Sequence, residues 1–155
     1  MVTEELAPIL EKRQECMAAG KEIDLSGSDL TGFDLTESVL FRANLAQADL
    51  HETRLAGAHL GSANLQKANL SQAIVARADL VGADLSDADL TGAYLAGADL
   101  SDAKLDNAKL SGACLRGADL SRTSFCQSQL VGADLRGVSA INASMYQANL
   151  SQVNL

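Results

Sequence analysis

Hydrophobic residues recur at every fifth position along most of the chain. From Leu25 to Leu155 every fifth residue is apolar, and 23 of these 27 positions hold leucine. The exceptions are Val75, Phe125, Ala140 and Met145. Two places before most of these positions the side chain is small, with alanine at 18 of the 27 sites and serine or threonine at five more. The consensus unit reads Ala-Asp-Leu-Ser-Gly.

A period of five excludes both regular elements. In an α-helix each step would turn the leucine by about 140°, so the leucines would scatter around the axis. In a straight strand an odd period would place successive leucines on opposite faces. The chain must therefore bend once in every unit. A short extended piece places the alanine and leucine on one side, and the Ser-Gly pair forms the corner.

Repeated bends in one sense wind the chain into a coil around a leucine and alanine interior. Backbone groups then pair between successive coils, as in other solenoids. The period alone leaves open whether three, four or five units complete a turn.

The units at residues 78–82 (ADLVG), 83–87 (ADLSD) and 98–102 (ADLSD) resemble the pentapeptide repeat family. The resemblance covers residues 23–155. It implies an all-β fold, a right-handed quadrilateral parallel β-helix with four units in each turn. Residues 20 apart would then stack, and residues 23–155 would form about 6.5 coils. For function the resemblance implies little, because members of the family have unrelated or unknown tasks.

Residues 1–22 do not follow the period of five and form a separate predicted segment. Leu6, Ile9 and Leu10 have the spacing of one helix face, which Cys16 and Met17 continue. Pro8 favours a helix start near itself, and Gly20 a helix end. We therefore expect an N-terminal capping α-helix over the first coil.

The C-terminal repeats stay in register to the final leucine. An open coil exposes its interior and its unpaired backbone edge, which proteins usually cover. Either two molecules meet end to end or the chain belongs to something longer. The sequence thus predicts a homodimer through the C-terminal coil.

The composition fits a narrow interior. Hydrophobic residues make up 47% of the chain but aromatic residues only 3%. Phe33 and Phe125 occupy inward positions of the unit, whereas Phe41, Tyr94 and Tyr146 occupy outward ones. Since no run of 18 apolar residues occurs, we expect no membrane span.

The net charge of −8 disfavours direct binding to nucleic acid or to anionic membranes. Sorted by the four implied faces, the charges of the repeats are −2, −3, +1 and −2 in chain order. Three cysteines without a paired motif favour a reduced, cytoplasmic chain.

The fourth face carries a candidate acidic stripe. Asp79, Asp99 and Asp119 are 20 residues apart and should stack, with Asp102 beside them. Such a stripe either resembles the phosphates of DNA and binds a basic partner, or repeats a consensus residue without a target. Similar columns of acids on the first and second faces are interrupted by lysine. Lys104 stacks with Asp84, and Lys109 stacks with Asp89.

The third face is less polar and carries the candidate interaction surface. Ile74, Tyr94 and Cys114 replace aspartate or asparagine at one phase of the repeat, and arginines lie along the same face. A tyrosine with arginine neighbours is a common interface composition. In the competing interpretation, these side chains only stabilise the surface by stacking on one another, and the arginines balance the charge of nearby acids. The candidate residues are Ile74, Tyr94, Arg77, Arg116 and Arg136, together with the exposed rings of Phe41 and Tyr146.

No catalytic, metal or cofactor site is predicted. His51 and His59 do not fall into one stack, and no third metal ligand accompanies His51 and Glu52. Cys114 and Cys126 are also out of stack, so we expect no disulfide. No serine, cysteine or lysine has a base and an orienting group at a definable spacing, and many of the serines are corner residues. The glycines follow the five-residue period, so no phosphate-binding loop is present.

The sequence therefore predicts a non-enzymatic structural or protein-interaction module with an unknown protein partner. The alternative rests on resemblance to family members that mimic DNA, bind DNA gyrase and protect it from quinolones. This chain shares their acidity, but its unbroken period leaves no projecting loop.

Overall fold

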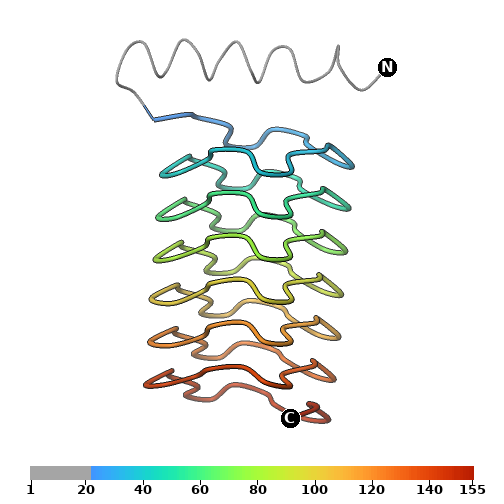
Figure 1. Cartoon of the computed structure of the whole chain (residues 1–155), viewed down its shortest axis with the longest axis vertical. Helices are drawn as coiled ribbons and strands as arrows, with labels where there is room; N and C mark the ends of the chain where they lie inside the picture. The colour runs from blue at the N-terminus through green and yellow to red at the C-terminus, as the bar shows by residue number, and fades with distance from the viewer. Residues whose placement is uncertain (1–21) are drawn as a thin grey trace.

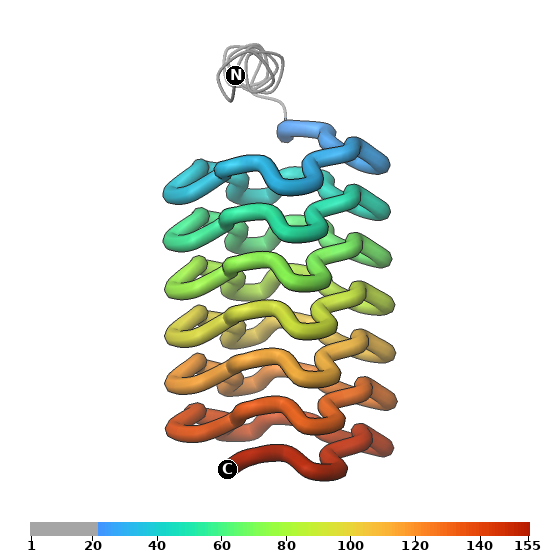
Figure 2. Tube along the Cα trace, turned by 90° about the vertical axis from the view of Figure 1, so that its right-hand side faces the viewer, coloured from blue at the N-terminus to red at the C-terminus, as the bar shows by residue number. Residues whose placement is uncertain are grey.

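The computed structural model describes residues 22–155. These residues wind into similar coils that stack along one axis, from blue to red in Figures 1 and 2. The N-terminal capping helix predicted for residues 1–22 lies almost entirely outside the described residues and stays a prediction. Within the described part of the chain, no helix is long and apolar enough to cross a membrane.

Residues 22–155 contain no helix and no strand longer than one paired residue. Each unit has three extended residues followed by a two-residue corner. The middle extended residue pairs in parallel with the residue 20 positions further on, from Asp24 with Asn44 to Asp134 with Asn154. Four units therefore complete each coil, as the resemblance implied, and side chains 20 apart form columns along the axis.

Backbone hydrogen bonds join neighbouring coils at the same three places in each unit. The amide of Leu85 donates to the carbonyl of Lys104 at 2.7 Å, and that of Asp87 to Asp106 at 2.9 Å. In the other direction, the amide of Asp84 donates to Ala63 at 2.9 Å. Because buried backbone groups must be paired, this pattern fixes the register of each coil on the next.

Every corner uses the left-handed backbone conformation. The residue two places after the inward leucine has φ between 56° and 70° in all units, in ten glycines and sixteen other residues. Glycine adopts this conformation without steric cost, whereas other residues do so at some expense. The sequence suggested glycine only as an aid where the corner needs it. The structure shows that the conformation is required at each corner, whatever the residue.

The consensus aspartate supports the corner that follows it. Asp84 accepts hydrogen bonds from the backbone N–H of Ser86 at 3.1 Å and from its hydroxyl at 2.7 Å. All ten aspartates at this position accept the same backbone bond from the residue two places on. This local bond stabilises a turn, so the repeated acid has a structural role in every unit where it occurs.

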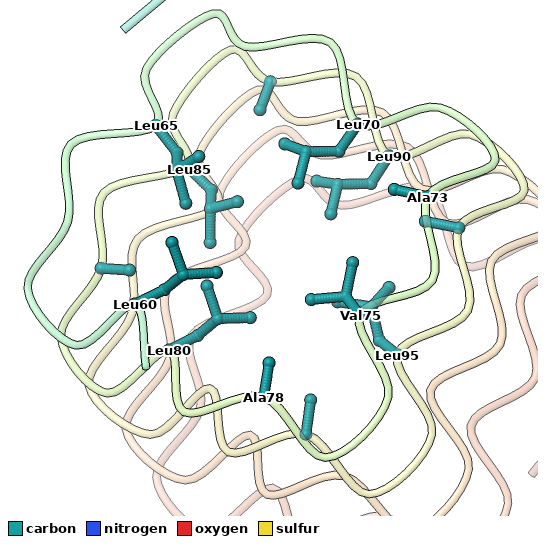
Figure 3. Packing of buried hydrophobic residues seen from close by; sticks show 14 of the residues in the cluster. Leu60, Leu65, Leu70, Ala73, Val75, Ala78, Leu80, Leu85, Leu90 and Leu95 are labelled. Carbon is teal, nitrogen blue, oxygen red and sulfur yellow. The ribbon is translucent and has the colours of Figure 1, made fainter. Parts of the chain in front are cut away.

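The interior consists of the leucine and alanine columns. The leucines from Leu45 to Leu130 and the alanines two places before them are 0–1% exposed, and Figure 3 shows several of these side chains pointing into the coil. Phe125 is fully buried and Phe33 packs against the core from the first coil, as predicted for both rings. Each buried leucine contributes roughly 1.5–3 kcal/mol before the entropy cost of folding.

Inward threonines are satisfied by backbone carbonyls. The hydroxyl of Thr53 donates to Leu30 at 2.8 Å, and that of Thr123 donates to Leu100 at 2.7 Å. Both threonines are fully buried, so these bonds offset the cost of burying a hydroxyl. The interior therefore tolerates threonine in place of alanine without a break in the repeat.

Candidate interaction surface

The less polar column on the third face forms as predicted. Ile74 pairs with Tyr94 and Tyr94 with Cys114, one coil apart in each case. Ile74 is 40% exposed and Tyr94 is 48% exposed. Since these side chains replace the aspartate of the consensus, they create an apolar strip on an otherwise polar surface.

An open hollow of about 580 Å³ lies beside Tyr94, at the corner that follows the third face. Its floor is made of the small residues Ala56, Gly57, Ala76, Ala96 and Gly97. Tyr94, Arg77, Glu37 and Thr36 complete its lining.

This hollow was not predicted from the sequence. The signal was present as small residues at the corner positions, 20 apart at Ala56, Ala76 and Ala96, and 40 apart at Gly57 and Gly97. Those positions were interpreted as turn residues only. Their shared column becomes a surface feature once four units are known to complete a coil.

Two arginines of the predicted surface, Arg77 and Arg116, form no ion pair among residues 22–155, and both are exposed. Arg136 instead binds Asp134 through two bonds of 2.8 and 2.6 Å. Hydrogen bonding from Arg136, with a smaller contribution from the Arg116 charge, lowers the pKa of Asp134 to about 2. Arg136 is therefore neutralised by its neighbour, whereas Arg77 and Arg116 keep their charge available.

The other two predicted rings lie elsewhere. Phe41 and Tyr146 are exposed, at 57% and 68%, as expected. However, Phe41 follows the fourth face and lies over Gly61, with 3.2 Å between a ring carbon and the position of a Cβ there. Tyr146 follows the first face in the last coil. The structure thus brings together Ile74, Tyr94, Arg77 and Arg116, and separates Phe41 and Tyr146 from them.

The acidic stripe also forms as a column. Asp79 pairs with Asp99 and Asp99 with Asp119 in successive coils. These carboxylates accept the backbone N–H of the corner that follows, at 3.0, 2.9 and 2.9 Å. The hydrogen bond from Ser121 lowers the pKa of Asp119.

Arg122 lies within this stripe. Its guanidinium binds Asp102 through two bonds of 2.7 and 2.6 Å, and the charges of Asp99 and Asp119 also raise its pKa. Hydrogen bonding from Arg122 lowers the pKa of Asp102. The stripe therefore contains a cation that the sequence analysis did not place there, because arginine two places after Leu120 gave no sign of its partner.

Histidine and cysteine form no site in the described part of the chain. His51 Nδ1 lies 2.9 Å from both the carbonyl and the hydroxyl oxygen of Ser71, and its Nε2 lies 3.4 Å from Glu52. Cys114 and Cys126 are free thiols. No group of three metal-binding side chains occurs among residues 22–155.

Comparison with known proteins assigns the family. The family model for pentapeptide repeats matches residues 21–57, 53–92, 83–122 and 118–155, in eight copies. The chain therefore belongs to the pentapeptide repeat family, whose members are right-handed quadrilateral β-helices. No functionally curated protein matches the chain significantly.

Several solved structures are similar to this chain. HetL, a pentapeptide repeat protein involved in heterocyst differentiation regulation from the cyanobacterium Nostoc sp. strain PCC 7120, is 31% identical. The match covers 84% of this chain and 75% of HetL, with a TM-score of 0.30. Rfr23 from the cyanobacterium Cyanothece 51142 is 23% identical over 94% of each chain, with a TM-score of 0.37. QnrB1, a plasmid-mediated fluoroquinolone resistance protein, is 19% identical over 86% of this chain and 78% of that one, also with a TM-score of 0.37.

Proposed function

We propose that the protein is a non-enzymatic interaction module that binds a protein partner through its third face. The observation that carries this proposal is the open hollow beside Tyr94, which Arg77 lines and next to which Arg116 lies in the following coil. Neither arginine forms an ion pair among residues 22–155. Aromatic and arginine side chains are the residues most enriched among those that dominate binding at interfaces. The cytoplasmic location expected from the cysteines stays a prediction.

Affinity capture from an extract of the source organism tests the role of this surface. Wild-type protein is compared with Tyr94→Ala and with Phe41→Ala, which removes an exposed ring from a different corner. A partner that uses the third face is lost with Tyr94→Ala, by about tenfold or more, and is retained with Phe41→Ala. If only Phe41→Ala abolished capture of the partner, the binding surface would be the corner that carries Phe41.

A second candidate function is the mimicry of DNA at gyrase, and the stacked carboxylates of Asp79, Asp99 and Asp119 favour it. The Arg122 guanidinium opposes it, because it neutralises part of the stripe. A gyrase supercoiling assay with and without a quinolone separates the two functions. An interaction module for another partner leaves both reactions unchanged at micromolar protein, whereas a mimic changes them.

We also propose self-association through the last coil. Its exposed apolar side chains are Ile141, Tyr146, Leu150 and Leu155, at 68%, 68%, 37% and 84%. Burying this surface against a second copy would remove it from water and pair the backbone edge of the coil.

A further inference from the structure

Arg77 and Arg116 are exceptions among the arginines that the structure describes. Of the six arginines in residues 22–155, the other four each lie within ion-pair distance of a carboxylate. The chain as a whole carries −8, so carboxylates are abundant on its surface. Two unpaired guanidinium groups near one hollow therefore form a local cationic site on an acidic protein.

The floor of the hollow is narrow and shaped by the corner. It is built from the two corner residues of successive coils, which are small in the pairs Ala56-Gly57 and Ala96-Gly97, whereas the pair between them is Ala76-Arg77. The stem of Arg77 passes over the next coil, with its Cγ 3.5 Å from the position of a Cβ at Gly97. A floor two residues wide accepts an extended chain, whereas a helix about 10 Å across is too wide for it.

On this basis we infer that the hollow binds an extended acidic segment of a protein partner. The inference rests on the function proposed above and specifies the partner of the same surface. Carboxylates of the segment pair with Arg77 and Arg116, since guanidinium and carboxylate form strong two-point hydrogen bonds. An apolar side chain between them contacts Tyr94 and Ala96.

The placement of charges also gives the segment a spacing and a direction. Arg77 and Arg116 belong to coils two apart, so their backbones are separated by about 10 Å along the axis at a strand spacing of ~4.8 Å. Three residues of extended chain span about the same length. Glu37 lines the opposite end of the hollow and repels acids, so the acidic part of the segment lies toward Arg116.

Fluorescence anisotropy with purified full-length protein tests the inference. The probe is a short labelled peptide with two glutamates separated by proline and leucine, and its control has glutamine at both positions. We expect the glutamate peptide to bind, and Arg77→Glu and Arg116→Glu each to weaken binding about tenfold or more. The glutamine peptide binds at least tenfold more weakly, and added salt weakens the glutamate peptide because exposed ion pairs are screened.

Lys67→Glu is the matched control variant. Lys67 occupies the same corner position on a different edge, with φ of 58° against 56° for Arg77, and it forms no ion pair within residues 22–155. The site-specific inference requires that Lys67→Glu change the affinity by less than about twofold. Equal weakening by Lys67→Glu would show general charge attraction and overturn the inference.

Two further outcomes also overturn it. Absence of binding at millimolar peptide rejects an acidic segment, although loss of the captured partner with Tyr94→Ala would still support the proposed function. Sedimentation that shows self-association lost with Arg77→Glu would assign the hollow to a second copy of this chain.

Discussion

The left-handed corner residue is the most demanding position in each unit. Sixteen residues other than glycine adopt positive φ there, among them Arg77 and Lys67. The conformation is unfavourable for residues with a Cβ, so the hydrogen bonds between coils must hold it. These corners let charged side chains occupy sites where the backbone would otherwise favour glycine.

A glycine-to-alanine substitution measures the strain of this conformation. At Gly112, φ is +67° and an added Cβ would meet no atom within 4 Å, so Gly112→Ala tests the backbone alone. We expect a loss of about 1 kcal/mol in the free energy of unfolding, measured by urea denaturation. The neighbouring Ser111→Ala, outside the left-handed region, should stay within about 0.5 kcal/mol. If Gly112→Ala left the free energy of unfolding unchanged, the coil would be able to relieve the backbone strain.

The candidate site was predictable at the residue scale only in part. The stacking of Ile74, Tyr94 and Cys114 followed from the period and the implied four units per coil. The pairing of Arg136 with Asp134, and of Arg122 with Asp102, depends on the path of a flexible side chain. A five-residue pattern predicts whether a residue faces inward or outward, but it does not predict which neighbouring carboxylate a long side chain reaches. The distinction between paired and free arginines therefore required the structure.

At the scale of the repeat unit, the interior behaves as a set of columns. Leu80 is fully buried between Leu60 and Leu100, whereas Leu155 holds the same place in the unit and is 84% exposed. The same sequence position thus has different energetic weight in different coils. Burial depends on whether a further coil covers the side chain.

A pair of leucine substitutions tests this dependence. Leu80→Ala leaves a cavity in the closed interior and should cost about 2–5 kcal/mol. Leu155→Ala removes an exposed side chain and should cost less than about 1 kcal/mol. Both are measured as changes in the free energy of unfolding by urea, with circular dichroism as the signal. Similar losses would show that the last coil is covered in solution.

The unit itself was the most predictable element. The period of five excluded a helix and a straight strand and placed alanine and leucine inside, as the structure confirms. The local bond from aspartate to the corner was not predicted, because the acids were considered as surface charge. Ten equivalent bonds now explain why this residue type recurs before the leucine.

At the scale of the whole molecule, the inward leucines of the middle coils are buried, whereas the last coil leaves apolar side chains exposed. Ile141, Tyr146 and Leu155 are each more than half exposed. An exposed apolar group of this kind commonly marks a contact surface.

Sedimentation equilibrium tests the proposed self-association. We expect wild-type protein to form dimers, and Tyr146→Glu to shift the equilibrium toward monomer by about tenfold in the dissociation constant, because it adds a charge to the apolar end. Phe41→Glu introduces the same charge in the first coil, far from the last one, and should leave the equilibrium between monomer and dimer unchanged. A wild-type monomer at high concentration would contradict the proposal.

The twenty-residue register has a consequence for how such a protein diverges. Inward and outward residues alternate within each unit, and the outward ones lie in columns that no interior contact depends upon. Selection for interior packing therefore acts on the inward positions, and selection for binding acts on the outward positions that do not hold a corner-stabilising aspartate. Relatives can keep the leucine and alanine columns while they exchange partners through a handful of surface substitutions. Overall sequence identity between two relatives then indicates a shared fold. Whether they bind the same partner is indicated by the residues of a single outward column, compared position by position.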